Sequence, residues 1–193
     1  MNTAGALVTA ATPRVPLLDA ASAPLTARRY FSDGDPGPIV AALASVPELL
    51  EVTLPFLSTV LSASALDART KEIVIVRTSA VQECRYCIDA HSVVALDTGL
   101  TVAEVRTLSE RGPASLPDER EAALLAWIDA VAGATGPVQD SVAARLGASY
   151  RDYEIVELTL LIGATMMLNR FCTALSLPTS TEVTMRLTEE GLV

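Results

Sequence analysis

Apolar and amphipathic stretches, separated by proline and glycine, dominate the chain and predict a helical protein. Breaks such as Gly99, Gly112-Pro113 and Gly136-Pro137 mark where helices end. The candidate helices lie at residues 39–45, 48–62, 84–97, 101–111, 117–131, 138–146 and 150–175. The last of these is apolar on nearly all sides, which predicts a central position in the fold.

Local signals conflict between residues 67 and 81. Asp67 suits the N-cap of a helix, whereas Ile73-Val74-Ile75-Val76 is a β-branched run typical of a buried strand. The residues on either side of this run contain no Gly, Pro or Asn to end a strand, and the rest of the chain is helical. We therefore predict a buried helix here and an all-α fold of roughly seven to eight helices.

The composition fits close-packed helices in one domain. Hydrophobic residues make up 50% of the 193 residues and aromatic residues only 4%, so the core must consist mainly of Ala, Val, Leu and Ile. The first 27 residues are rich in Ala, Thr and Pro and show no basic region typical of a secretory signal. We expect residues 1–35 to form an extended, flexible N-terminal arm and residues 36–193 to form the helical domain.

The charge excludes several classes of partner. The net charge is −9 and Lys71 is the only lysine, so we expect neither a nucleic-acid partner nor binding to an anionic membrane. The apolar run from Leu158 to Leu168 is too short to span a membrane. Three cysteines do not suit a secreted disulfide framework, and a reducing cytoplasm fits better.

The strongest sign of chemistry is the pattern C-x-x-C-x-x-x-H, formed by Cys84, Cys87 and the only histidine, His91. On a helix these three side chains lie within about 60° of one another. Two thiols that can form a disulfide beside a base are the minimum for thiol redox chemistry. Proton removal by His91 would favour Cys87 as the thiolate that attacks a peroxide. Cys84, nearer the helix start and expected to be more exposed, would then resolve the sulfenic acid.

Two other interpretations of the cysteine pair are weaker. Zinc normally takes four ligands, and Cys172, the remaining cysteine, lies far away in the sequence, so we expect no metal site. A purely structural disulfide between Cys84 and Cys87 would restrain little loop entropy. Cys172 itself is more typical of a small hydrophobic residue packed on an apolar helix. We expect no cofactor other than a redox-active Cys84–Cys87 disulfide.

Three neighbouring residues could contribute to this site. Glu72 precedes Cys84 by 12 residues, about 18 Å along a continuous helix, so it reaches the thiols only if the chain reverses between Ser79 and Glu83. Its local sequence also fits a solvated carboxylate at a helix start. Tyr86 could point into the site or towards solvent, and Glu83 fits an exposed acid of the first turn.

These motifs resemble a known family. The segments Leu66-Asp67-Ala68-Arg69-Thr70-Lys71-Glu72, Cys84-Arg85-Tyr86-Cys87 with His91, and Thr98-Gly99-Leu100-Thr101 are similar to the alkyl hydroperoxidase D-like branch of the carboxymuconolactone decarboxylase family. Their spacing is E-x11-C-x-x-C-x-x-x-H, and the resemblance, to peroxidase-related members in particular, covers about residues 36 to 178. The founding pattern has a histidine between the cysteines where this chain has Tyr86.

The resemblance implies an all-α orthogonal helical domain that assembles into homotrimers or homohexamers. It implies a thiol-dependent peroxidase or oxidoreductase without metal or haem, whose partners are a hydroperoxide substrate and an external dithiol or protein-thiol reductant. In that scheme Cys87 is the peroxidatic thiol and Cys84 the resolving, partner-facing thiol. His91 and Glu72 form the proton relay.

Two other functions remain open. The first is a lyase or isomerase acting on a small acidic or biosynthetic intermediate, with His91 and Glu72 as acid and base and with dispensable cysteines. The second is a non-catalytic oligomer that senses redox state through the Cys84–Cys87 disulfide.

Overall fold

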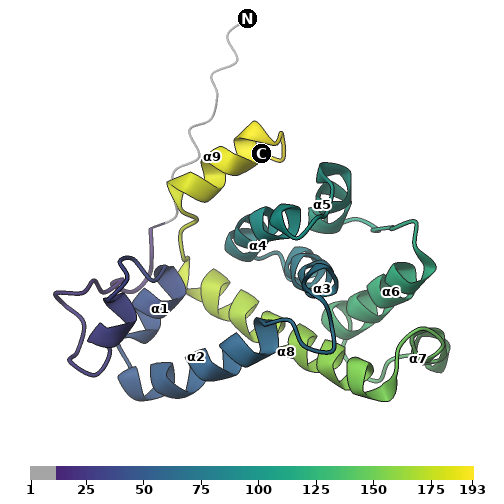
Figure 1. Cartoon of the computed structure of the whole chain (residues 1–193), viewed down its shortest axis with the longest axis horizontal. Coiled ribbons are helices and arrows are strands. Elements are labelled where there is room, and N and C mark those ends of the chain that lie inside the picture. The colour runs from purple at the N-terminus through teal and green to yellow at the C-terminus, as the bar shows by residue number, and fades with distance from the viewer. Residues whose placement is uncertain (1–11) are drawn as a thin grey trace, which may run out of the picture.

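The computed structural model describes residues 12–193, which form nine α-helices and one 310-helix and contain no strand (Figure 1). The predicted all-α fold is therefore confirmed. In chain order the elements are η1 (Arg28–Phe31), α1 (Pro38–Leu43), α2 (Pro47–Leu61), α3 (Ala68–Val81), α4 (Arg85–Asp97), α5 (Val102–Ser109), α6 (Glu119–Gly133), α7 (Asp140–Gly147), α8 (Asp152–Leu175) and α9 (Thr181–Glu189).

α3 lies at the centre of the domain and packs against α4, α5, α6 and α8 (Figure 1). The Asp67 carboxylate accepts a hydrogen bond from the backbone N–H of Thr70 at 2.7 Å and so starts the helix. Residues 73–76 are helical and buried, which confirms the helix and not the strand. Packing on every side makes these β-branched residues favourable in a helix, because their burial outweighs a small difference in propensity.

A three-residue connection reverses the chain between α3 and α4. Gln82 caps the end of α3, Glu83 has a left-handed backbone with φ of 57°, and Cys84 is the N-cap of α4. The N–H of Cys84 also donates a hydrogen bond to the carbonyl of Ser79 at 3.0 Å. The reversal that Glu72 requires is therefore present, and α4 starts one residue later than predicted.

The outer helices begin at caps that their sequences indicate. Thr101 and Glu104 form a capping box at the start of α5, and Asp118 caps α6. α9 was not among the predicted helices; it packs on α4, and the hydroxyl of its N-cap Ser180 accepts a hydrogen bond from the backbone N–H of Val183. A serine two residues after Pro178 is the signal that could have found this helix.

α8 contributes one face to the core and leaves another apolar face exposed. Leu158, Leu161 and Ile162 are buried, whereas Val156 and Leu160 are exposed. The prediction of a central helix therefore holds for one face only. By length and composition α8 could also cross a membrane, contrary to the prediction from the shorter apolar run. However, 39% of its apolar window is buried inside this fold, and core helices of soluble proteins meet the same criterion.

Residues 12–35 pack against the domain, unlike the extended arm expected from the sequence. Ala27 and Phe31 are buried with Leu50 of α2. The backbone N–H of Arg14 donates a hydrogen bond to the carbonyl of Leu175 at 2.9 Å. The guanidinium of Arg14 donates another to the carbonyl of Ala174 at 3.0 Å. Residues 1–11 of the expected arm lie outside the described residues, and the domain boundary at residue 35 stays a prediction.

Candidate active site

Three cysteines meet where the start of α4 lies against the end of α8. Cys84 is the N-cap of α4, Cys87 is in its first turn, and Cys172 comes from the last turn of α8. The Sγ atoms of Cys84 and Cys87 are 2.6 Å apart, and all three sulfur atoms lie within 4.8 Å of one another. All three are free thiols. The structure brings the expected pair together and adds Cys172, for which the sequence had suggested only a packing role.

This thiol cluster, defined as Cys84, Cys87 and Cys172, is buried. Cys84 and Cys172 are each 1% exposed and Cys87 is 5% exposed. The prediction that Cys84 is the more exposed thiol is therefore wrong, because the end of α8 and residues 12–35, called the N-terminal segment below, cover the start of α4. The surrounding shell is mostly apolar: the side chain of Thr173 hydrogen-bonds to Cys84, and the hydrophobic members of the shell are Val15, Leu17, Ile39, Ala42, Tyr86, Phe171, Leu175 and Leu177.

Close packing makes the three thiols share their protons. Hydrogen bonds donated by Cys172 and then by Cys87 lower the pKa of Cys84 to about 3. Hydrogen bonding to Cys172 and to Cys84 raises the pKa of Cys87, and hydrogen bonding to Cys84 raises the pKa of Cys172 to about 12. One sulfur therefore carries a negative charge while the other two stay protonated and stabilise it. The N-cap position favours Cys84 for this charge, because free backbone N–H groups lie at the helix start.

Glu72 of α3 and His91 of α4 face each other across the hairpin. Oε2 of Glu72 lies 2.9 Å from Nδ1 of His91. The Glu72 side chain is only 9% exposed, so it is not the solvated carboxylate that its local sequence allowed. This contact orients the imidazole and leaves Nε2 as the nitrogen able to exchange a proton. His91 follows Cys87 by one turn of α4.

The two flanking candidates occupy different environments. Tyr86 packs in the apolar shell of the thiol cluster, and burial, together with the nearby thiols, raises its pKa. Glu83 is exposed and forms an ion pair with Arg111 at 2.9 Å. Tyr86 therefore lies at the site, whereas Glu83 lies on the surface beside it.

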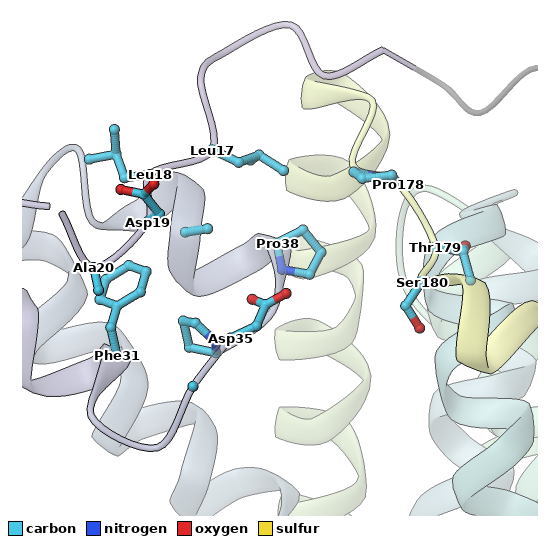
Figure 2. Close-up of a pocket in the computed structure, with 13 residues that line it drawn as sticks. Leu17, Leu18, Asp19, Ala20, Phe31, Asp35, Pro38, Pro178, Thr179 and Ser180 are labelled. Carbon is cyan, nitrogen blue, oxygen red and sulfur yellow. The ribbon is translucent and has the colours of Figure 1, made fainter. Parts of the chain in front are cut away.

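A cavity of about 550 Å³ lies between the N-terminal segment and the connection from α8 to α9. Figure 2 shows residues of the N-terminal segment on one side of it and Pro178, Thr179 and Ser180 on the other. Leu17 lines the cavity and also belongs to the shell around the thiols. The lining is mostly apolar, with the carboxylates of Asp19 and Asp35 as its charged groups. Sequence reasoning missed this cavity because its walls are far apart along the chain.

Comparison with known proteins gives this arrangement a family context. The model of the carboxymuconolactone decarboxylase family matches residues 47–130, which run from α2 into α6. A structure from Agrobacterium tumefaciens, described as a protein of unknown function and a candidate antioxidant defence protein AhpD, is 28% identical with a TM-score of 0.67. The similarity covers 72% of this chain and 96% of that one. The family match and this similar structure support the resemblance of the motif to the alkyl hydroperoxidase D-like branch of the carboxymuconolactone decarboxylase family.

Two further structures share the family fold at 18% identity, which supports the fold alone. One is an alkylhydroperoxidase AhpD core, an uncharacterized peroxidase-related protein from Ralstonia eutropha JMP134, with a TM-score of 0.78 over 90% of this chain and 95% of that one. The other is a cysteine-to-alanine variant of the debrominase Bmp8 in complex with 2,3,4-tribromopyrrole, with a TM-score of 0.74 over 93% of this chain and 100% of that one. The comparison with curated proteins found no match.

Proposed function

We propose that this protein is a thiol-dependent peroxidase that reduces hydroperoxides with the Cys84–Cys87 pair. The observation that carries the proposal is the 2.6 Å separation of these two sulfur atoms on the same hairpin as the Glu72–His91 contact. The match to the carboxymuconolactone decarboxylase family model and the likeness to a candidate antioxidant defence protein support an enzyme. Two thiols supply the two electrons that a hydroperoxide needs, so the reaction requires no metal or other cofactor.

In the first step the sulfur of Cys87 attacks the terminal oxygen of the hydroperoxide. An S–O bond forms and the O–O bond breaks, which leaves Cys87 as a sulfenic acid and releases an alkoxide. Because hydrogen bonding raises the pKa of the Cys87 thiol, its attack needs a base: His91 takes this proton and returns it to the alkoxide, which leaves as an alcohol. Glu72 stabilises the imidazolium while it carries that proton.

In the second step Cys84 resolves the sulfenic acid. Its lowered pKa supports this role, because the sulfur is then a thiolate at neutral pH. The Cys84 thiolate attacks the sulfur of Cys87, the S–S bond forms, and the S–O bond breaks to release hydroxide, which takes up a proton to become water. Overall, two thiols and one hydroperoxide give a disulfide, an alcohol and water.

The cycle closes when an external dithiol or protein thiol reduces the disulfide by exchange. Because Cys84 is only 1% exposed, the N-terminal segment has to move before a reductant reaches this sulfur. The hydrogen bonds of Arg14 to the end of α8, and the bond that the Leu18 N–H donates to the carbonyl of Ala41, hold this segment in place.

The cavity that shares Leu17 with the shell around the thiol cluster supports an organic hydroperoxide with an uncharged, apolar group. Its lining is apolar apart from Asp19 and Asp35, and carboxylates repel an anionic substrate. Ala20 lines the cavity at an exposed position, so Ala20→Trp reduces its volume without disturbing the core. We expect this variant to raise KM for cumene hydroperoxide and to leave KM for hydrogen peroxide unchanged.

The decisive experiment is peroxide consumption by Cys87→Ser and Cys84→Ser variants with a dithiol reductant, combined with mass-spectrometric mapping of the cysteines. Wild-type protein forms a Cys84–Cys87 disulfide after one equivalent of peroxide. Cys87→Ser loses turnover, and Cys84→Ser stops at a Cys87 sulfenic acid that dimedone labels. Full turnover by Cys87→Ser would overturn the proposal, and a stable sulfenic acid on Cys84 instead would reverse the two roles.

The same variants distinguish the two alternative functions. A lyase or isomerase that uses His91 and Glu72 as acid and base keeps its activity when both cysteines are replaced. A redox sensor shows no turnover with any variant but changes its assembly when the disulfide is reduced. Either pattern excludes the peroxidase.

We also expect a homotrimer or homohexamer in a reducing cytoplasm. The exposed apolar face of α8 supports self-association, since Val156, Leu160 and Met167 line a groove with Phe56 of α2. Light scattering tests this expectation: Leu160→Glu converts an oligomer into a monomer. A wild-type protein that is already monomeric would contradict it.

A further inference from the structure

The thiol cluster contains one sulfur more than the proposed peroxidase reaction uses. Cys172 takes no part in a disulfide between Cys84 and Cys87, yet its sulfur lies within 4.8 Å of both. All three thiols are free and buried. Cys172 is distant from the pair along the chain, which had spoken against a metal site, but the fold brings its sulfur to the other two.

The surroundings restrict what three such sulfur atoms could bind. Among residues 12–193, these three cysteines are the only group of three or more His, Cys, Asp and Glu side chains whose donor atoms come together this closely. The shell around them is mostly apolar. Thiolates are soft ligands that select thiophilic ions over magnesium, calcium or manganese. A closed zinc site normally takes a fourth protein ligand, which this group does not offer.

Charge decides between the remaining thiophilic ions. Three thiolates around a divalent ion leave one net negative charge, and around copper(I) they leave two. Burying uncompensated charge is costly, so a neutral complex is favoured even over the single negative charge that the three free thiols share. A trivalent centre bound to three thiolates is neutral, and trivalent arsenic or antimony forms a pyramid with three ligands and needs no fourth. We propose that Cys84, Cys87 and Cys172 form a site that captures a trivalent thiophilic metalloid such as arsenite.

The capture is a condensation without electron transfer. Arsenous acid, As(OH)3, reacts with three thiols to give As(S–Cys)3 and three molecules of water. Three As–O bonds break and three As–S bonds form, and each thiol proton leaves with a hydroxide as water. Arsenic stays trivalent and no oxidant or reductant is consumed.

This site and the redox reaction exclude each other, because both use Cys84 and Cys87. Protein oxidised to the Cys84–Cys87 disulfide has one free thiol left and cannot form the three-sulfur complex. A bound metalloid in turn blocks attack on a peroxide. Capture therefore depends on the redox state of the pair but does not require that the protein turns over peroxide.

The test measures binding of two arsenicals to the reduced, full-length protein by calorimetry, with native mass spectrometry to establish the adduct. Arsenite engages three thiols, whereas phenylarsine oxide engages only two. We expect one arsenite per chain in wild-type protein and a loss of affinity of about 100-fold or more in Cys172→Ala and Cys172→Ser, because a direct ligand is removed. Phenylarsine oxide should bind wild type and both variants alike, which shows that the variants are folded and keep the Cys84–Cys87 pair.

Arsenite binding of equal strength in Cys172→Ala and wild type would overturn the proposal, since two thiols would then suffice. It is also overturned if wild-type protein binds phenylarsine oxide but not arsenite, or binds neither. Zinc that binds reduced wild-type protein more tightly than arsenite contradicts the charge argument. A protein that captures arsenite but consumes no peroxide leaves this inference intact and excludes only the peroxidase.

Discussion

α3 and α4 both begin with ionisable side chains in buried surroundings. Those near the start of α3 form ion pairs, whereas those at the start of α4 lie among apolar residues. Near the start of α3, Lys71 is 1% exposed and donates to the carbonyl of Val60 at 2.7 Å and forms an ion pair with Glu157 at 2.7 Å. Nearby, Arg69 bridges Glu104 and Glu121. At the start of α4, the thiol cluster has a mostly apolar shell, and the main hydrogen-bond partners of its sulfur atoms are one another.

This difference separates structural groups from reactive ones. Lys71 and Arg69 near the start of α3 have fixed ionic partners, and the Arg69 guanidinium lowers the pKa of Glu104 to about 2. The thiols have no such counter-ion in their shell, so one negative charge is shared by three sulfur atoms and can move between them. We call Lys71 and Arg69, with their partners Glu157, Glu104 and Glu121, the ionic group. We expect substitutions in the ionic group to change stability and substitutions at the thiols to change reactivity.

The largest effect should follow from breaking the ionic group. Lys71→Ala leaves two backbone carbonyls and Glu157 without their cation, and we expect a loss of about 3–5 kcal/mol in unfolding free energy. Urea denaturation measures the change. The control is Arg29→Ala, which removes an exposed pair with Glu51 and should cost at most about 1 kcal/mol. Equal losses in the two variants would remove the contrast between the two helix starts.

The next effect concerns the proton relay. Glu72→Gln keeps the shape of the side chain but removes the carboxylate that stabilises a protonated His91. We expect kcat for peroxide reduction to fall by about 100-fold while unfolding free energy changes by about 1 kcal/mol or less. Glu83→Gln is the matched control and should keep full activity, because Glu83 is exposed and pairs with Arg111. If both variants are equally active, Glu72 has no part in the reaction.

A smaller effect should appear in how the thiols respond to pH. The pKa of Cys84 is lowered from an ordinary 9.0 to about 3, so its contribution to stability is present above pH 9 and is lost as pH falls towards 3. Cys172→Ala removes the main donor and should flatten this decline. At acidic pH the rate of alkylation of Cys84 should fall about tenfold for each unit by which its pKa rises. Identical pH profiles for wild type and variant would contradict a shared charge.

The smallest effect should come from the cover over the thiols. Arg14→Ala removes one hydrogen bond from the N-terminal segment to the end of α8, so unfolding free energy should change by at most about 1 kcal/mol. Alkylation of the thiols by a bulky maleimide should nevertheless become several-fold faster. Arg28→Ala is the control, since Arg28 binds the carbonyl of Ala23 within the same segment. If the two variants react alike, this segment does not control access.

The sequence predicted the parts of the site that depend on local order. The C-x-x-C-x-x-x-H spacing places Cys84, Cys87 and His91 correctly, because one helix fixes their relative positions. Glu72 required the resemblance to a known family as well, since local sequence alone could not show that the chain turns back. The β-branched run of α3 illustrates how burial overrides propensity.

Features that depend on distant packing could not be predicted. Cys172 has the sequence context of a core residue, and only the crossing of α8 over the start of α4 brings its sulfur to the pair. The burial of Cys84 has the same origin, because a helix start is exposed until another segment covers it. The N-terminal segment was expected to be flexible from its composition, yet Ala27 and Phe31 find apolar partners on α2.

The left-handed residue Glu83 makes the hairpin sensitive to changes in length. With only three residues between the two helices, the connection sets both where α4 starts and how it is rotated relative to α3. One residue inserted in this connection could shift the start of α4 by one position. Each position along a helix corresponds to a rotation of about 100°, so the shift would turn His91 away from Glu72. Deletions and insertions should therefore be tolerated in the loop between α6 and α7 but not here. The contact between the carboxylate of Glu72 and the imidazole of His91 therefore depends on the length of the three-residue turn between α3 and α4.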